Sequence, residues 1–318
     1  MREYISKLAP LMRDFEQYQL ASGRWCDSSN LYLTLFDRHC AAKFPDSENL
    51  TQEMLSTWCG KRATETNNSC RSRIYPVVSF VRFLQKRGLT DVNAPAIPRK
   101  EARTYIPHAF TKEELQNFFD ACDTITSYSE TEEQISQRYT VPVFFRLLYS
   151  SGIRTNEARI LRKSDVDLVH GILNIEYSKG HDQHFVVMHD SMLRLMREYD
   201  SVIGKMYPDR LYFFPARDGK SHTKQWVSVN FKRLWGKSNS GYVVPYEFRH
   251  NYAIENINSW TDDGFDFNQK LHSLSKSMGH SVIESTKYYY SLVPRLADVL
   301  AEHTNEDEVI PEVLYESH

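Results

Sequence analysis

The stretch from Val244 to Ser291 decides how the rest of the chain is interpreted. It contains YEFRH at residues 246–250, MGHS at 278–281 and TKYYY at 286–290. Arginine and imidazole side chains therefore precede a group of phenols. A neutral phenol is a poor nucleophile because its pKa lies near 10. It becomes useful where nearby cations and hydrogen-bond donors stabilise charge on the group that it attacks. No single residue is diagnostic, so the argument depends on order, spacing and two elements upstream.

Length and composition define the broad class of protein. The chain has 318 residues, which is enough for two domains with separate cores. Hydrophobic residues make up 41% and charged residues 25%, as is usual for a soluble globular protein. No apolar run approaches the roughly 20 residues that span a bilayer, and the N-terminus lacks a signal-peptide core. We therefore expect a cytoplasmic protein with no membrane partner.

Cysteine usage points the same way. The five cysteines are scattered and form no C-x-x-C pair. Such a set favours reduced thiols over a disulfide framework, and it provides no zinc-binding pattern. We therefore predict neither a metal nor another cofactor.

The charge of the chain is unevenly distributed, although its formal net value is only −2. Residues 1–106 carry 16 lysines and arginines against 11 aspartates and glutamates, whereas residues 291–318 carry one arginine against seven acids. An acidic tail therefore masks a basic N-terminal third. A basic third would suit a nucleic-acid partner, and an asymmetry without functional meaning is the alternative.

Apolar residues at helical spacing predict a four-helix domain in residues 1–92, with helices over 3–21, 29–44, about 49–58 and 66–86. A linker should follow at 93–109, because three prolines interrupt the helical pattern there. If this part of the chain binds DNA, its cations would contact phosphates. Those cations are Arg71, Arg73, Arg82, Lys86 and Arg87 in the last helix, and Arg99, Lys100 and Arg103 in the linker. A solvated helix face and a plain linker are the alternatives.

The second domain should begin with a helix at Thr111, because Thr111 and Glu114 form a capping-box pattern. A polar loop is expected over 124–137, followed by a second helix that ends near Ser150. Gly152 then permits a sharp turn before a short helix capped by Thr155 or Asn156. Arg154 precedes that helix N-terminus, where anions are favoured. An ordinary arginine at a surface turn is the alternative.

Three short strands are predicted next, over 165–168, 172–177 and 185–188, with Lys179 in the hairpin loop between the last two. Helices should follow over 191–200 and 223–237, and another from Pro245. The expected fold is mainly α with a small antiparallel β-sheet. The N-terminal four-helix domain is joined to a mixed α+β domain at 110–291. A C-terminal helix and tail are expected over 292–318. The sequence is compatible with a helix that packs within its own chain and with one that is exchanged with another protomer.

Five motifs occur in a specific order: GIRxxE from Gly152, SKG from Ser178, YxxRH from Tyr246, MGHS from Met278 and TxxY from Thr286. Together they resemble the tyrosine recombinase (phage integrase, Xer-like) family. The resemblance covers residues 110–291. The N-terminal unit is similar in place and pattern to the core-binding (SAM-like) domain of that family. The resemblance implies a site-specific DNA recombinase that acts without metal or ATP.

The resemblance also implies a role for each matched residue. Arg154 and Arg249 would bind the non-bridging oxygens of the scissile phosphate, with Glu157 supporting the first arginine. Tyr289 would attack the phosphate and form a 3′-phosphotyrosyl link. Lys179 would protonate the leaving 5′ oxygen, and His280 would hydrogen-bond the phosphate or the nucleophile. His250 would be a less favoured acceptor for the proton of the nucleophile.

Two positions within the motifs need a separate decision. The family most often has histidine where this chain has Tyr246. We keep Tyr246 as a candidate catalytic residue, because a tyrosine can donate a hydrogen bond to phosphate, although it cannot shuttle a proton as imidazole does near pH 7. His280 and His250 remain the candidate acceptors for the proton of the nucleophile. Among the three consecutive phenols, Tyr289 has the family's spacing from Gly279. Neighbours on a helix point about 100° apart, so only one of them can face the phosphate.

The expected partner is double-stranded DNA with inverted-repeat core sites, bound by a homotetramer on two duplexes. The free protein would be a monomer or a weak oligomer, associated with the nucleoid in the cytoplasm. A type IB topoisomerase-like enzyme is the nearest enzymatic alternative. A catalytically weak DNA-binding relative is an alternative of a different class, supported only by Tyr246. The last alternative is a helical protein that does not bind nucleic acid, and salt-dependent DNA binding would exclude this alternative.

Overall fold

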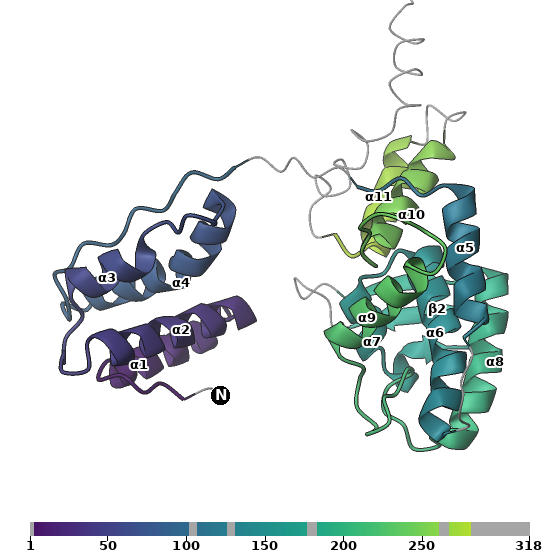
Figure 1. The fold of residues 1–318 in the computed structure, drawn as a ribbon, viewed down its shortest axis with the longest axis horizontal. Helices are drawn as coiled ribbons and strands as arrows, with labels where there is room; N and C mark the ends of the chain where they lie inside the picture. Colours follow the sequence, from purple (N-terminus) through teal and green to yellow (C-terminus); the bar gives the residue numbers. More distant parts are fainter. Residues whose placement is uncertain (1–2, 102–106, 126–130, 177–182, 261–266, 281–318) are drawn as a thin grey trace, which may run out of the picture. The chain divides into compact units, whose positions relative to one another are not determined.

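The computed structural model describes residues 3–101, 107–125, 131–176, 183–260 and 267–280 (Figure 1). The chain divides into two compact units, Met1–Tyr105 and Ile106–His318. Helices dominate, and the described strands form one three-stranded antiparallel sheet. The expected fold class is therefore confirmed. No helix within these described ranges is long and apolar enough to cross a membrane.

The first unit is a bundle in which α4 packs against each of the other three helices (Figure 1). Its helices are α1 Ala9–Ala21, α2 Asp27–Lys43, α3 Gln52–Cys59 and α4 Asn67–Gln85. The hydroxyl groups of Thr51 and Thr66 accept backbone N–H groups and so start α3 and α4. Apolar faces meet in a core whose aromatic centre is formed by Phe15, Phe36 and Phe80.

The chain beyond α4 stays against this first unit as far as Glu101. Asn93 exchanges two hydrogen bonds with the side chain of Gln52. Glu101 is joined to Asn67 and Asn68 near the start of α4. Much of the segment predicted as a linker therefore has defined partners on the helical bundle.

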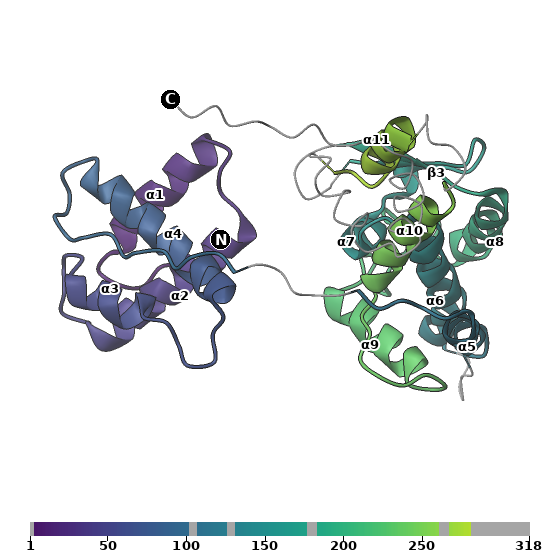
Figure 2. The same cartoon turned by 90° about the horizontal axis from the view of Figure 1, so that it is seen from above.

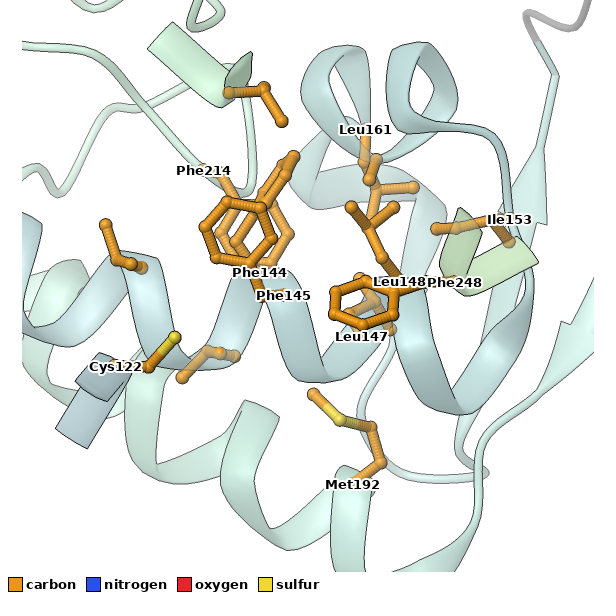
Figure 3. Close-up of a cluster of buried hydrophobic side chains, with 14 of the residues drawn as sticks. Cys122, Phe144, Phe145, Leu147, Leu148, Ile153, Leu161, Met192, Phe214 and Phe248 are labelled. Carbon is orange, nitrogen blue, oxygen red and sulfur yellow. The ribbon is translucent and has the colours of Figure 1, made fainter. Parts of the chain in front are cut away.

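The second unit is built around α6, which packs against α5, α7, α8 and α10 (Figures 1 and 2). Figure 3 shows Phe144, Phe145, Leu147 and Leu148 of α6 in one buried cluster with Cys122 of α5, Met192 of α8 and Phe248 of α10. The helices are α5 Lys112–Asp123, α6 Glu132–Ser151, α7 Thr155–Ile160, α8 Asp190–Met206, α9 Lys224–Trp235, α10 Glu247–Asn258 and α11 Phe267–Ser277. The sequence did not predict α11.

Helix starts in this unit follow side-chain caps. The predicted capping box is present, with Thr111 and Glu114 each accepting the other's backbone N–H. The loop predicted over 124–137 is wrong in its second half. The hydroxyl group of Thr131 caps Gln134, so α6 begins at Glu132 despite its polar first turn.

The sheet has the order β1-β2-β3 and is antiparallel throughout. Its strands are β1 Val166–Asp167, β2 Ile172–Ile175 and β3 His184–Val187, and a 3-10 turn at Lys163–Asp165 precedes them. Ile175 pairs with His184, so residues 176–183 connect β2 to β3. Lys179 belongs to this connection and lies outside the described residues.

Candidate active site

Arg249 lies in the first turn of α10, and its guanidinium group holds two other segments. The residue is only 1% exposed. Its Nη1 donates to the carbonyl oxygen of Gly152 at 2.6 Å, and its Nη2 donates to the carbonyl of Met278 at 2.6 Å. Nη2 also lies 2.9 Å from Nε2 of His280. One buried cation therefore joins the turn after α6 to the turn after α11.

Arg154 occupies the junction between α6 and α7. Glu157, itself almost fully buried, accepts the backbone N–H of Arg154 at 2.7 Å and its Nη1 at 2.6 Å. Nη2 of Arg154 donates to the carbonyl of Gly279 at 2.9 Å. The N-cap of α7 is Arg154 itself, so the predicted cap at Thr155 or Asn156 is wrong. The reason is that the Glu157 carboxylate satisfies the backbone donor at Arg154 and takes over the capping role.

Two glycines make the approach of these segments possible. Gly152 has φ +63° and Gly279 has φ +61°, a left-handed conformation that side chains rarely adopt. A Cβ at residue 152 would lie 2.3 Å from the ring of Tyr252. A Cβ at residue 279 would lie 2.5 Å from the ring of His184. Glycine is therefore required at both turns for backbone conformation and for space.

His280 follows Gly279 directly and is neutral at pH 7. Burial is the largest cause that lowers its pKa to about 4, and the nearby Arg249, Arg154 and His184 contribute to the same shift. Because a guanidinium group has donors only, Nε2 of His280 must accept from Arg249. The ring proton then resides on Nδ1.

Tyr246 and His250 are neighbours on the first turn of α10. Their rings meet edge to face with centroids 5.0 Å apart. Tyr246 is 40% exposed, whereas His250 is nearly buried. Burial is the main cause that lowers the pKa of His250, Arg249 adds to the effect, and Glu247 opposes it. The phenol at residue 246 therefore packs against an imidazole whose pKa is held below its usual value.

The structure brings Arg154, Glu157, Arg249 and His280 into one hydrogen-bonded group, from segments up to 125 residues apart. Two guanidinium groups beside a neutral imidazole can bind an anion with directional, charge-assisted hydrogen bonds. Lys179 and Tyr289 lie outside the described residues, as do Tyr288 and Tyr290. Among the residues that the structure does describe, no cluster of histidine, cysteine or acidic side chains is arranged to hold a metal ion.

The predicted DNA-contacting cations of the first unit differ in their surroundings. Arg73 is 3% exposed and forms two hydrogen bonds with Glu65, as well as others with the carbonyls of Trp58 and Gly60. Its guanidinium group is therefore committed inside the bundle, and the prediction that Arg73 contacts DNA does not fit the structure.

The other predicted cations remain compatible with such contacts. Arg71 is half-buried and donates to the carbonyl of Pro98. The exposed members of the set are Arg82, Lys86, Arg87, Arg99 and Lys100. Arg87 packs its guanidinium group 3.8 Å from the ring centre of Phe83. Arg103 lies outside the described residues.

Sequence reasoning missed His184 and Tyr252, the two rings that pack against the glycine turns. The signal for His184 was available, since it occupies an inward position of a strand whose buried and exposed residues alternate. Tyr252 carries no comparable signal, because an aromatic residue on a buried helix usually belongs to a core.

Comparison with known proteins defines the class. The profile of the phage integrase family matches residues 108–294, which include the whole hydrogen-bonded group. The chain belongs to the phage integrase family, the tyrosine recombinases. It is thus related to DNA recombinases by sequence over more than half of its length.

Individual relatives agree with this assignment. The tyrosine recombinase XerC of Chlorobaculum tepidum is 27% identical over 249 residues, which cover 70% of this chain and 68% of the relative. A putative integrase/recombinase of Sinorhizobium fredii, y4rE, is 25% identical over 218 residues, covering 65% and 68%. The fold resembles that of XerH recombinase bound to a palindromic difH substrate, with TM-score 0.60, 16% identity and coverage of 88% and 80%. A lambda integrase dimer bound to a core site gives TM-score 0.60 at 14% identity, covering 89% and 76%.

Proposed function

We propose that this protein is a site-specific recombinase that cleaves and rejoins duplex DNA through a 3′-phosphotyrosyl intermediate. The observation that carries the proposal is the joining of Arg154, Arg249 and His280 into one group at the Gly279 turn. The family motif that supplies the nucleophile follows this turn in the sequence. Phosphate binding and attack would therefore be contributed by adjacent parts of the chain.

The two guanidinium groups would bind the non-bridging oxygens of the scissile phosphate. Charge develops on these oxygens in the pentacoordinate transition state, and preorganised donors stabilise it most effectively. Glu157 and the carbonyls at the two glycine turns hold the arginines in place before DNA arrives. The neutral ring of His280 would donate a hydrogen bond from Nδ1 to phosphate or to the attacking phenol when DNA is bound.

Tyr289 would attack phosphorus, forming the protein–DNA bond as the bond to the 5′ oxygen breaks. Lys179, carried between β2 and β3, would protonate that leaving oxygen. The link conserves the phosphodiester energy, so attack by a hydroxyl from another strand reverses the step without ATP. His280 is a weak base because its pKa is about 4 and its Nε2 is engaged by Arg249. A weak base is a poor acceptor for the tyrosine proton.

The DNA partner would be a duplex with inverted-repeat core sites, recombined by a tetramer on two duplexes. A lambda integrase tetramer bound to a Holliday junction has a similar fold, which supports this assembly by analogy. Exposed cations of the first unit, such as Arg82 and Lys86, would contact phosphates on one side of the duplex. The C-terminal segment 292–318 lies outside the described residues.

The test uses a core site selected by the protein itself from random-sequence duplexes. A nicked version of that site traps covalent intermediates, which migrate as protein–DNA adducts on a denaturing gel. The wild type should form adducts, and Tyr289→Phe should form none. Tyr288→Phe and Tyr290→Phe are matched controls that should retain them. An adduct that persists in Tyr289→Phe would show that another residue is the nucleophile.

Strand exchange separates the proposal from its enzymatic alternative. Two duplexes that carry the site and different labels should yield recombinant products. Relaxation of supercoiled DNA without such products would instead indicate a type IB topoisomerase-like activity. DNA binding with neither reaction would indicate a catalytically weak relative, as the tyrosine at residue 246 would allow.

A further inference from the structure

The imidazole of His184 packs against a turn of the candidate site that is remote from it in sequence. His184 is the first residue of β3 and pairs with Ile175 of β2, so it ends the connection that carries Lys179. Its ring also packs against the main chain of Gly279, so closely that a Cβ there would overlap it. Packing of α11 against β3 brings these two segments together.

The location of His184 is unusual for an imidazole. His184 and Val186 face the interior of the unit, whereas Phe185 and Val187 face outward. His184 is only 7% exposed. Inward positions of such a strand are usually apolar, so an imidazole sets this position apart. The feature that it contacts is the left-handed turn at Gly279.

The Gly279 turn is where both arginines are anchored. The carbonyl of Gly279 accepts from Arg154, and the carbonyl of Met278 accepts from Arg249. His280, the next residue, also contacts Arg249. A shift of this turn would therefore move the acceptors of both guanidinium groups at once.

We propose that His184 is a positioning residue that holds the Gly279 turn against the start of β3. Its ring supports the turn from one side, while its backbone is fixed in the sheet by pairing with Ile175. The carbonyl acceptors of both phosphate-binding arginines would thus depend on one side chain. This inference rests on the proposed function, because it concerns the geometry of that same site.

The test compares His184→Ala, which removes the ring, with His184→Phe, which keeps a flat ring. Phe185→Ala is the matched control, since Phe185 is the next residue of the strand and is 60% exposed on the opposite face.

Two quantities are measured: the single-turnover rate of adduct formation at saturating protein, and the Kd for an intact core site. Misplacement of reacting groups by about 1 Å can slow a reaction on the order of a hundredfold. We expect His184→Ala to lose at least about tenfold in rate with an unchanged Kd. His184→Phe should recover most of the rate, and Phe185→Ala should match the wild type.

A double-mutant cycle tests the contact itself. Gly279→Ala places a methyl group against the ring of His184, so its melting temperature should fall. In the His184→Ala background the same change meets no ring and should cost less, although the backbone strain at residue 279 persists. Additive effects of the two substitutions would show that the ring does not support the turn.

The outcomes separate this inference from the proposed function. A wild type that forms no adduct overturns both. A wild type that forms adducts, with His184→Ala equally fast, overturns only the role of His184. If His184→Ala does not fold, His184→Phe decides: a folded Phe variant with near wild-type rate supports positioning by the ring, and a folded slow one contradicts it.

Discussion

Arg249 donates a hydrogen bond of 2.6 Å to the carbonyl oxygen of Gly152, which lies 97 residues earlier in the chain. Gly152 belongs to the turn that presents Arg154, and Arg154 in turn donates to Gly279 beside the second acceptor of Arg249. The turn that carries Arg154 thus accepts a hydrogen bond from Arg249, and the turn at Met278 and Gly279 accepts from both arginines. The two guanidinium groups are consequently placed as a pair, and disturbance of either turn should affect both.

Substitution of Gly152 tests how strongly the first turn is constrained. We expect Gly152→Ala to lower the free energy of unfolding by about 2–4 kcal/mol, from left-handed strain and overlap with the Tyr252 ring. Gly219→Ala is the control, because φ there is +74° but no atom lies near the new Cβ. It should cost only about 1 kcal/mol. Urea unfolding measures both, and equal losses would show that the contact with Tyr252 is unimportant.

Glu157 should matter for stability as well as for the placement of Arg154. Glu157→Ala removes the acceptor of two hydrogen bonds and leaves a mostly buried cation without its carboxylate. Such losses cost about 3 kcal/mol. Asp123→Ala breaks a more exposed pair with Arg146 and should cost less than about 1 kcal/mol. The comparison again uses urea unfolding, and a Glu157 variant as stable as the Asp123 variant would contradict the role assigned to this carboxylate.

Much of the fold could be predicted because its signals are local. The capping box at Thr111, the alternation in the strands and the glycine at residue 152 each act within a few residues. The start of α6 was missed because its first turn is polar, and only the cap at Thr131 reveals it. Local composition there favoured a loop over a helix.

The identity of the site residues was predictable, but their attachment was not. The acceptors that hold the arginines are backbone carbonyls, which every residue possesses and no motif records. The burial of Arg73 depends on Glu65, eight residues away across a turn. The sequence shows that a helix carries a cation, but it does not show whether a buried carboxylate in the bundle already binds that cation.

The two arginines of α4 at residues 73 and 82 should therefore behave differently. Arg82→Ala removes an exposed cation, so DNA affinity should fall and the slope of log K against log salt should decrease by about 0.9. Arg73→Ala should leave that slope unchanged. It should instead lower the free energy of unfolding by about 3 kcal/mol, because Glu65 loses its buried partner. Salt titrations of binding and urea unfolding distinguish the two, and a reduced slope for Arg73→Ala would restore it as a DNA contact.

The neutral state of His280 predicts how stability depends on pH. Its pKa is about 4 in the folded protein, below the usual value of 6.5, because burial and the neighbouring cations disfavour its charged form. The unfolded chain therefore binds a proton first as pH falls. The stability linked to His280 is fully present above pH 6.5 and is lost as pH falls from 6.5 towards 4.

His280→Gln replaces this titrating ring with an amide that can still accept a hydrogen bond from Arg249. We expect the variant to lose less stability than the wild type between pH 6.5 and 4, measured as the urea midpoint at several pH values. His222→Gln is the matched comparison, because burial also lowers the pKa of His222 to about 4 at a separate position beside Trp226. Its effect should be similar, and the double variant should show the sum of the two, because Arg249 contacts one ring and Trp226 stacks on the other. An unchanged pH dependence in His280→Gln would mean that the imidazole has the same pKa in the folded protein as in the unfolded chain, which contradicts its assignment as a neutral acceptor from Arg249.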